Sequence, residues 1–426
     1  MEVKITAFPA ENGESILIEC YGVKKTNILV DLGYSQTYKK FIEKKLRSLA
    51  KLDEKIDLLV LTHYDADHIE GAIAFFEELL VDPFIDIEEI WVNEFLSLSS
   101  QQLDKNELNK EQESIYNFSK FMANIYRLGS STITNKEIST EHSVTITKLI
   151  KELGYDKKIN KSLVDKIICV HAEDTDNLIK INNEVELTIL APQKSKLQEQ
   201  LIDFLKWFEK NKNIHLYIPK EELYELFVAS SDANKVNDTN NIILKKEISS
   251  DINYQEKIGS ILRSKDTLGT NSLANKTSIA FSLKFKNLNL MFTGDIDAET
   301  LISELESTEN RYDLLKISHH GSKNNTNRLL LNSINCNNYL ICTDGRGRSK
   351  HPNLETLVYI ANSGNVRKCA SNIYLNYPLN EINISKDCIA TLISTLGANI
   401  YQTDTKKEGA IELIFEKGEL IWKEEN

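Results

Sequence analysis

The sequence predicts an α/β protein. Short apolar runs of strand length alternate with amphipathic runs of helix length over residues 1–95 and again from Ser278 onward, with Gly or Asn at several of the turns. The first part opens with three β-like runs and continues as β-α-β. Its expected strands are Val3–Phe8, Ser15–Glu19, Asn27–Val30, Ile56–Leu61 and Glu89–Val92, and its expected helices are Thr37–Leu52 and Ile69–Leu80.

The second part predicts strands and helices in turn, and closes with a hairpin. A turn at 396–399 leads into a late strand, because Gly and Asn tolerate positive φ. The expected strands are Ser278–Lys284, Leu288–Phe292, Leu314–Ile317, Tyr339–Cys342, Ile400–Thr403, Ala410–Phe415 and Glu419–Trp422, and the expected helices are Ala298–Leu305 and Thr326–Leu331.

The middle segment, residues 96–270, has a different pattern. It is mostly polar, and residues 230–270 are rich in Ser, Asn, Asp and Lys, which indicates a flexible loop. We therefore predict a domain in two halves, 1–95 and 271–426, separated by a largely helical insertion. Within the insertion we expect helices at Asp104–Tyr126 and Leu197–Lys210 and strand-like islands at Lys166–Val170 and Val185–Leu190.

Composition excludes several protein classes. Of the 426 residues, 41% are hydrophobic and 27% charged, which is typical of a globular chain and excludes a fibrous or wholly disordered one. The net charge of −12 opposes non-specific wrapping of a long nucleic acid. The six cysteines form no CxxC pair, and no apolar run resembles a secretory leader or a membrane span. We therefore expect a cytoplasmic protein without a disulfide framework.

The strongest local motif is THYDADH at Thr62–His68, between an apolar strand and a helix. His63, Asp65, Asp67 and His68 place two imidazoles and two carboxylates within six residues. At the carboxyl end of a strand, a tight turn can converge such side chains on one point. Imidazole and carboxylate are common metal ligands, so the motif predicts a metal site.

Two later strands also end in candidate ligands. Asp295 follows the run Leu288–Phe292 after a glycine, and the adjacent His319 and His320 follow Leu314–Ile317. Each motif alone is weak, because turns often contain Gly-Asp and single histidines are common in cores. Three strand ends that each offer His or Asp indicate one shared site.

Together these motifs resemble the metallo-β-lactamase-fold hydrolase superfamily, which usually shows HxHxDH, a later Gly-Asp and a final His. The HxDxDH pattern at 63–68 is similar to that of the hydrolase domain of ComEC-type DNA-uptake channels, without the channel's membrane helices. The resemblance covers residues 1–95 and 275–415 in order. Its other marks are Gly13–Ser15, Val30–Gly33, Asn275–Ser278, Thr293–Asp295, His319–Ser322, His351–Pro352 and Gly409–Ile411.

The resemblance implies an αββα sandwich, in which two mixed sheets pack face to face with helices outside, and two divalent metal ions at one sheet edge. Asp295 would bridge the ions, with His63 and Asp65 toward one of them. The implied ligands of the other ion are Asp67, His68 and either His319 or His320. We expect catalytic roles for Asp67, His320 and His351, and support of the ligands by Asp31, Asn275 and Ser278.

Two points about the metals stay open. Asp65 stands where most relatives carry His, and a carboxylate suits Mn²⁺ or Mg²⁺ better than an imidazole does, so zinc and manganese are both compatible. The superfamily's middle histidine ligand also has no clear counterpart. His142, His171 and His215 are the available residues, and each is as compatible with a purely structural role.

The loop Thr343–His351 follows another apolar strand and places cations among glycines. Such a loop suits a phosphate, through point charges and an approachable backbone, although a solvated loop has the same composition. We expect Arg346 and Arg348, with Lys323 beside the histidine pair, to bind a substrate phosphate.

The leading functional hypothesis is a phosphodiesterase or nuclease that acts on nucleic acid or nucleotide through a water activated by two metals. A first rival keeps the metals but hydrolyses a lactone, thioester or other small ester, which the net charge of −12 mildly favours. A second rival is a regulatory or binding protein without catalysis. For such a protein, the 96–270 segment offers a surface for a protein partner.

Overall fold

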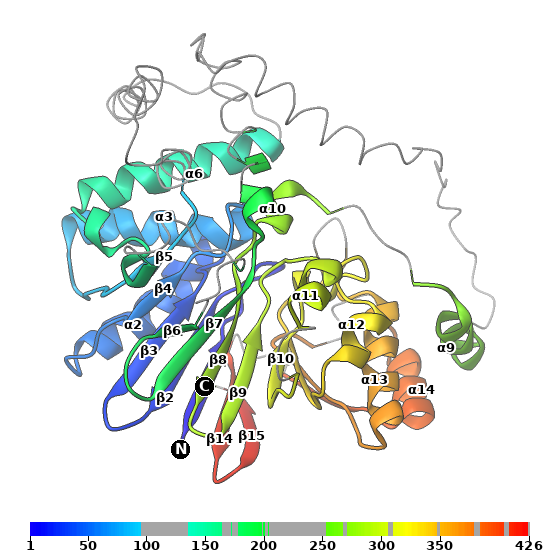
Figure 1. Ribbon diagram of the computed structural model, residues 1–426. Coiled ribbons are helices and arrows are strands. Elements are labelled where there is room, and N and C mark those ends of the chain that lie inside the picture. Colours follow the sequence, from blue (N-terminus) through cyan, green and yellow to red (C-terminus); the bar gives the residue numbers. More distant parts are fainter. Residues whose placement is uncertain are drawn as a thin grey trace.

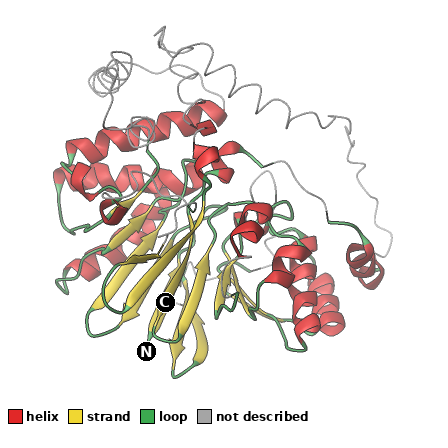
Figure 2. Cartoon of the chain, in the orientation of Figure 1, coloured by secondary structure: helices red, strands yellow, loops and turns green. Residues whose placement is uncertain are grey.

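Two mixed β-sheets lie face to face, and helices cover their outer faces (Figures 1 and 2). This arrangement confirms the αββα sandwich of the metallo-β-lactamase fold. The computed structural model describes residues 1–94, 135–163, 172, 178–197, 199–200, 203, 253–266, 271–305, 310–346, 350–378, 384–403 and 409–424.

The first sheet has seven strands in the order β15-β14-β1-β2-β3-β4-β5. Its antiparallel part is a meander joined to the terminal hairpin, and β4 and β5 continue it in parallel with β3. The strands are β1 (Val3–Ala7), β2 (Ile16–Tyr21), β3 (Lys25–Val30), β4 (Leu58–Val60), β5 (Ile90–Trp91), β14 (Ile411–Glu416) and β15 (Glu419–Glu424).

The second sheet has eight strands in the order β13-β12-β11-β10-β9-β8-β7-β6. The strands from β9 to β13 run parallel, and the others are antiparallel. The strands are β6 (Leu178–Lys180), β7 (Val185–Ala191), β8 (Ala280–Phe285), β9 (Leu288–Phe292), β10 (Leu314–Lys316), β11 (Asn338–Ile341), β12 (Asn372–Leu375) and β13 (Asn399–Gln402).

The helices form the two outer layers. In the described residues, no helix combines the length and apolar character needed to cross a bilayer. The first-sheet side carries α1 (Ser35–Thr37), the π turn η1 (Tyr38–Ile42), α2 (Glu43–Ala50), α3 (Ala66–Val81) and α6 (Asn135–Glu152), followed along the chain by the 3₁₀ turns η2 (Asp156–Lys158) and η3 (Lys161–Leu163). The later helical elements are α9 (Tyr254–Arg263), α10 (Leu273–Lys276), α11 (Ala298–Leu305), the 3₁₀ turn η5 (His319–Gly321), α12 (Arg328–Ser333), α13 (Leu354–Arg367) and α14 (Lys386–Leu396).

Three apolar clusters hold these layers together. The central cluster lies between the sheets and includes Ile18, Val60, Phe281 and Phe292. A second cluster packs α2, α3 and α6 on the first sheet, and a third packs α11 to α14 on the second sheet. The central strands are buried on both faces, which explains why they are continuous apolar runs rather than alternating ones.

The segment expected as an insertion is partly built into this core. Strands β6 and β7 lie within residues 96–270, yet β7 pairs with β8 over most of its length, so residues 178–191 complete the second sheet. The flexible loop expected over 230–270 also differs, because α9 forms within it and buries Ile258. The expected helix Asp104–Tyr126, the expected strand Lys166–Val170 and most of Leu197–Lys210 lie outside the described residues.

A buried ion cluster on the first sheet predicts acid-sensitive stability. Burial raises the pKa of the Glu19 carboxyl, but Lys25, Lys4 and Lys45 outweigh it and lower the pKa from 4.5 to about 2. The stabilisation from a lowered carboxyl pKa is complete above pH 4.5 and is lost as the pH falls through 2. Glu19→Gln should therefore cost about 3 kcal/mol at pH 7 and distinctly less at pH 3, measured by urea unfolding.

Glu88→Gln is the matched control for this prediction. Glu88 is also paired with lysine, with Lys55 at 2.6 Å, but it is 41% exposed. Exposed pairs contribute about 0–1 kcal/mol. The lowered pKa of Glu19 would be contradicted if Glu19→Gln reduced the free energy of unfolding as little as Glu88→Gln does, or by the same amount at every pH.

Candidate metal centre

One buried carboxylate anchors the loop between β4 and α3 through hydrogen bonds. Asp31 follows β3, is fully buried, and accepts hydrogen bonds from the Thr62 main-chain N–H at 2.8 Å and from the Thr62 hydroxyl at 2.6 Å. The loop then presents His63 and leads into α3, where Asp65 is the N-cap residue. The parallel pairing of β3 with β4 places Asp31 beside this loop.

The second sheet contributes the loops after β9 and β10. Gly294 has φ +49°, and a Cβ there would lie 2.2 Å from the Ser278 hydroxyl, so only glycine lets this loop pack. His319 and His320 both have positive φ, at 49° and 55°. Since β9 and β10 are parallel neighbours, their carboxyl ends meet at the same sheet edge.

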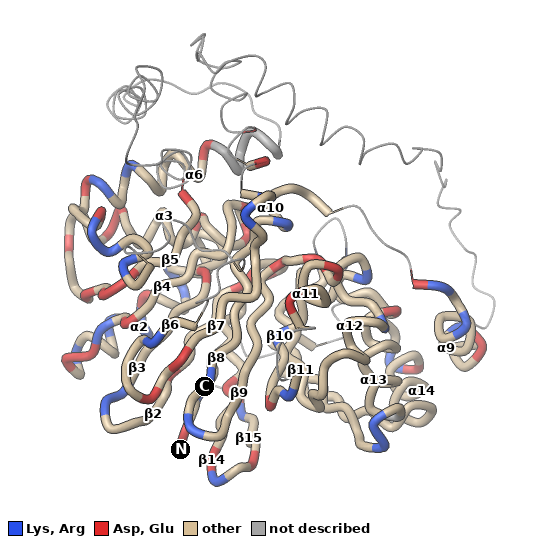
Figure 3. The backbone as a smooth tube through the Cα atoms, in the orientation of Figure 1, with Lys and Arg blue, Asp and Glu red and all other residues tan. Residues whose placement is uncertain are grey.

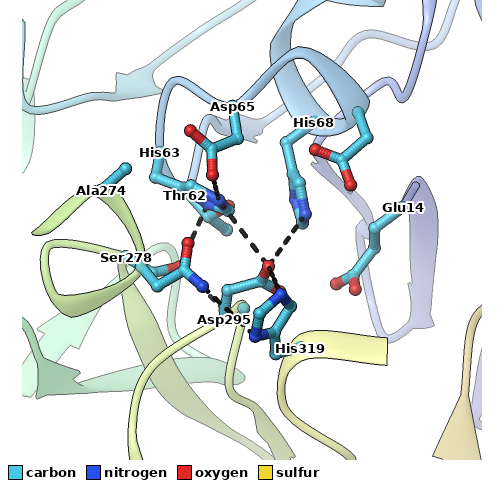
Figure 4. Close-up of polar contacts among 12 residues, drawn as sticks. Glu14, Thr62, His63, Asp65, His68, Ala274, Ser278, Asp295 and His319 are labelled. Atoms are coloured by element: carbon cyan, nitrogen blue, oxygen red, sulfur yellow. Dashed lines mark hydrogen bonds and ion pairs between the residues drawn. The ribbon is translucent and has the colours of Figure 1, made fainter. Parts of the chain in front are cut away.

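Four imidazoles converge on one carboxylate oxygen. The Nε2 atoms of His63, His68, His319 and His320 lie 3.8, 3.4, 3.8 and 3.7 Å from Asp295 Oδ2. Figure 4 shows His63, His68 and His319 approaching Asp295 from both sheets. Distances this long are not hydrogen bonds of normal strength, but they leave room for ions between the ligand atoms.

Two further carboxylates lie at the rim of this cluster. Asp65 Oδ2 is 3.7 Å from His63 Nε2, and Asp67 Oδ2 is 3.4 Å from His320 Nε2. The seven predicted ligands, four from the HxDxDH motif and three from the later Asp and His-His motifs, therefore meet in space, as the strand-end argument predicted for one shared site. The His68 and His320 Nε2 atoms are 3.3 Å apart.

The other ring nitrogen of each histidine is held by a neighbour. His68 Nδ1–H donates to Asp31 at 2.7 Å, and His320 Nδ1–H donates to the Cys342 carbonyl at 2.9 Å. The Thr62 hydroxyl donates its proton to Asp31, so its oxygen accepts from His63 Nδ1–H at 3.1 Å. In each ring Nδ1 is thus engaged by a neighbour, and Nε2 is the nitrogen that faces Asp295 and is available to a metal ion, as in metal-ligating histidines.

His319 is oriented by Asn325. The Asn325 amide nitrogen donates to the Asp295 carbonyl at 2.9 Å, so its oxygen faces His319 and accepts from Nδ1–H at 2.9 Å. Asn275 lies on the same side, with its amide nitrogen 3.2 Å from His319 Nδ1. Ser278 accepts the Asp295 main-chain N–H at 3.0 Å and lies 3.4 Å from His63 Nδ1.

The electrostatics of the cluster are those of a cation site. Burial raises the pKa of the Asp295 carboxyl, but His68, His319 and His320 lower it well below its usual value. Burial lowers the pKa of His68, but Asp295 and Asp31 raise it well above its usual value. Within the described residues, His63 Nε2 and Asp295 Oδ1 are buried and have no hydrogen-bond partner. Ligand atoms left in this state fit a metal ion.

The ligand atoms form two groups that could each hold an ion. His63, His68 and Asp295 make one group, and Asp67, His68 and His320 make the other, with the ligand atoms of each group within 4.8 Å of one another. His320 therefore belongs with Asp67 and His68, while His319 lies on the Asn275 side of Asp295. His142 is in neither group and donates from Nδ1 to the Tyr64 carbonyl at 3.1 Å. His171 and His215 lie outside the described residues.

The expected phosphate-binding residues differ in their surroundings. Lys323 is paired with Glu355 at 2.8 Å, so its charge is already compensated. Arg346 is 69% exposed and lies 3.6 Å from Asp344. Arg348 lies outside the described residues. His351 reaches the centre, since its ring centroid is 5.1 Å from that of His319 in an edge-to-face contact, and burial together with His319 and His320 lowers its pKa to about 3.

Sequence reasoning missed three residues that hold the ligands: Thr62, Asn325 and Lys316. Thr62 directly precedes the ligand His63, and Lys316 is the last residue of β10, three residues before His319. A polar side chain so close to an apolar strand and a ligand could have identified both. Asn325 has no comparable mark, because it lies in a polar turn where asparagine is ordinary.

A family model described as the metallo-beta-lactamase superfamily matches residues 9–89. No curated protein sequence matches the chain. The matched segment contains Asp31 and the loop with His63 and His68, and it ends before Asp295. The matching model describes the superfamily as a whole and does not test the resemblance to the ComEC-type subgroup, which stays a prediction. The match and the two groups of ligands together indicate a metal-dependent hydrolase built on the metallo-β-lactamase fold.

Proposed function

We propose that the protein is a phosphodiesterase that hydrolyses a nucleotide or a nucleic-acid end and uses two divalent ions. The convergence of four oriented Nε2 atoms on Asp295 is the observation that supports this most directly. Asp295 would bridge the ions. His63, Asp65 and His319 would hold the first ion, and Asp67, His68 and His320 the second.

Charge balance supports two ions rather than one. The carboxylates of Asp31, Asp65, Asp67, Asp295 and Glu14 surround the centre, and Lys316 is the cation paired with one of them. Five negative charges and one positive charge leave four uncompensated negative charges when the histidines are neutral. Asp31, Asp295 and Glu14 are buried, while Asp67 and Asp65 are 20% and 37% exposed. Charge without compensation at a largely buried centre is costly, and two divalent cations would balance it. Zinc and manganese both suit this mixture of imidazole and carboxylate.

When bound, the two ions would supply an activated water and stabilise the charge that develops on the attacking and leaving oxygens. The chain's own residues orient the ligands and shape the substrate site. His351 is a neutral imidazole at the edge of this centre, and it can hydrogen-bond to a phosphate oxygen. Arg346, on the same loop, would contact the substrate further out.

Surface charge favours a short substrate. Figure 3 shows acidic and basic residues interspersed over the described backbone, without a continuous basic band across this view. With a net charge of −12, the chain lacks the overall positive charge that wrapping a long duplex needs. A nucleotide, a cyclic nucleotide or a strand end is therefore the substrate class we propose.

The test is a cleavage screen on metal-free protein reconstituted with Mn²⁺ or Zn²⁺. A bis-phosphodiester chromogen, cyclic nucleotides, single strands and duplexes form one panel, and lactones and thioesters form the other. We expect turnover in the first panel. Faster turnover of lactones would favour the small-ester alternative, and no turnover of any phosphodiester with either metal would refute the proposal.

A variant of His351 separates substrate binding from metal binding. His351→Ala should lower kcat/KM for a phosphodiester by about 10²-fold, the usual effect of losing one hydrogen-bond donor in an active site. Elemental analysis should still find two ions per chain, because His351 is outside both ligand groups. Loss of an ion in this variant would contradict the role given to His351.

A further inference from the structure

A buried ion pair lies beside the ligand cluster and contributes no ligand to either group. Glu14 comes from the hairpin between β1 and β2 of the first sheet, and Lys316 is the last residue of β10 in the second sheet. Their side chains are 1% and 0% exposed. Burial lowers the pKa of Lys316, but Glu14 and Asp295 raise it above its usual value, so the ammonium stays charged. Figure 4 shows Glu14 extending toward the cluster.

Each member of the pair also donates a hydrogen bond to a segment that carries a ligand. The Lys316 ammonium donates to the Gly294 carbonyl at 3.1 Å, immediately before Asp295. The Glu14 main-chain N–H donates to the Asp67 carbonyl at 3.1 Å. A Cβ at Gly13 would lie 2.1 Å from that same carbonyl oxygen, so the glycine permits this close approach. The pair therefore connects the first turn of α3, which carries Asp67, to the loop after β9, which carries Asp295.

Asp67 and Asp295 differ in the other hydrogen bonds that anchor their main chains. Asp295 is anchored within its own sheet, since its N–H donates to Ser278 and its carbonyl accepts from Asn325. The Asp67 carbonyl is held by the Glu14 N–H of the hairpin. The histidines near Asp67 have separate anchors in Asp31 and the Cys342 carbonyl. Loosening the pair should therefore displace Asp67 more than the other ligands.

We propose that the Glu14–Lys316 ion pair is a positioning device that sets the separation of Asp67 from Asp295 and thereby retains the second metal ion. This inference rests on the proposed two-ion function. A competing explanation is that the pair only stabilises the fold. The two explanations differ, because a buried ion pair can often be replaced by apolar side chains of similar volume without loss of stability, whereas such a replacement cannot supply the hydrogen bond to Gly294.

The test uses the full-length chain, stripped of metal and titrated with Co²⁺, whose absorption spectrum reports the coordination of each ion. The variants are E14L/K316M, which replaces both charges with apolar side chains, and E14Q, which keeps the shape but removes one charge. We expect wild type to bind two ions. In the double variant, we expect first-ion affinity within about threefold of wild type and second-ion affinity weakened by about 10–100-fold, the usual effect of losing a residue that orients a ligand. E14Q should weaken the second ion by a smaller factor.

Glu19→Gln is the control. Glu19 lies on β2, and its buried carboxylate pairs with Lys4 and Lys25 of the neighbouring strands, away from the ligand residues. It should lower stability and leave both cobalt affinities unchanged. Unchanged second-ion affinity in either folded Glu14 variant overturns the inference and leaves the proposed function standing. If wild type itself binds fewer than two ions, the proposed function fails, and the inference fails with it.

Discussion

Asp295→Ala is expected to abolish both metal binding and hydrolysis. Asp295 Oδ2 is the oxygen that all four imidazoles face, so in the proposed two-ion centre its removal would take a ligand from both ions. Metal ions stabilise transition-state charge by several kcal/mol, and about 4 kcal/mol corresponds to about 10³-fold in rate. We therefore expect less than one ion per chain by elemental analysis and at least about a 10³-fold loss of phosphodiesterase turnover.

Asp297→Asn is the matched control for this experiment. Asp297 lies two residues further along the same loop, and its carboxylate accepts the Thr300 N–H at the start of α11. Asparagine caps helices as well as aspartate does, so fold, metal content and turnover should remain. If Asp295→Ala kept two tightly bound ions, the bridging role of this carboxylate would be refuted.

Asp31→Ala should weaken metal binding without removing any ligand. Asp31 holds His68 directly and holds His63 through the Thr62 hydroxyl, so two rings lose their orientation together. Partners of this kind typically contribute about 10–100-fold to metal affinity. We expect a loss at the upper end of that range, measured by competition with a chelator of known affinity. Asp31→Asn should lose less, because the amide oxygen can still accept one of these hydrogen bonds.

Asp57→Asn separates this effect from a general loss of a buried carboxylate. Asp57 immediately precedes β4 of the first sheet and accepts the Asn27 main-chain N–H at 2.9 Å, away from the ligand residues. The variant should keep the metal affinity of wild type, and its amide oxygen can still accept the Asn27 N–H. Equal metal affinities in Asp31→Ala and wild type would show that the histidines need no support from Asp31.

Much of the fold could be predicted from local sequence. The runs around Leu58–Val60 and Leu288–Phe292 are apolar because their strands are buried on both faces, and burial of this kind is visible in a short window. Strand β6 and helix α9 were less predictable. Helix α9 is mostly polar, and β6 is a three-residue edge strand whose place depends on pairing with β7.

Which ligands are available, and in what order they follow the strands, can be read from local sequence, because a strand and the turn after it are adjacent in the chain. His63, Asp295 and His320 could be identified in this way. Three features follow from the packing of the chain in space: the two groups of ligands, the compensation of the Lys323 charge by Glu355, and the pairing of Glu14 with Lys316. These contacts join residues up to about 300 positions apart. They depend on how the two sheets pack against each other, and no short stretch of sequence contains that information.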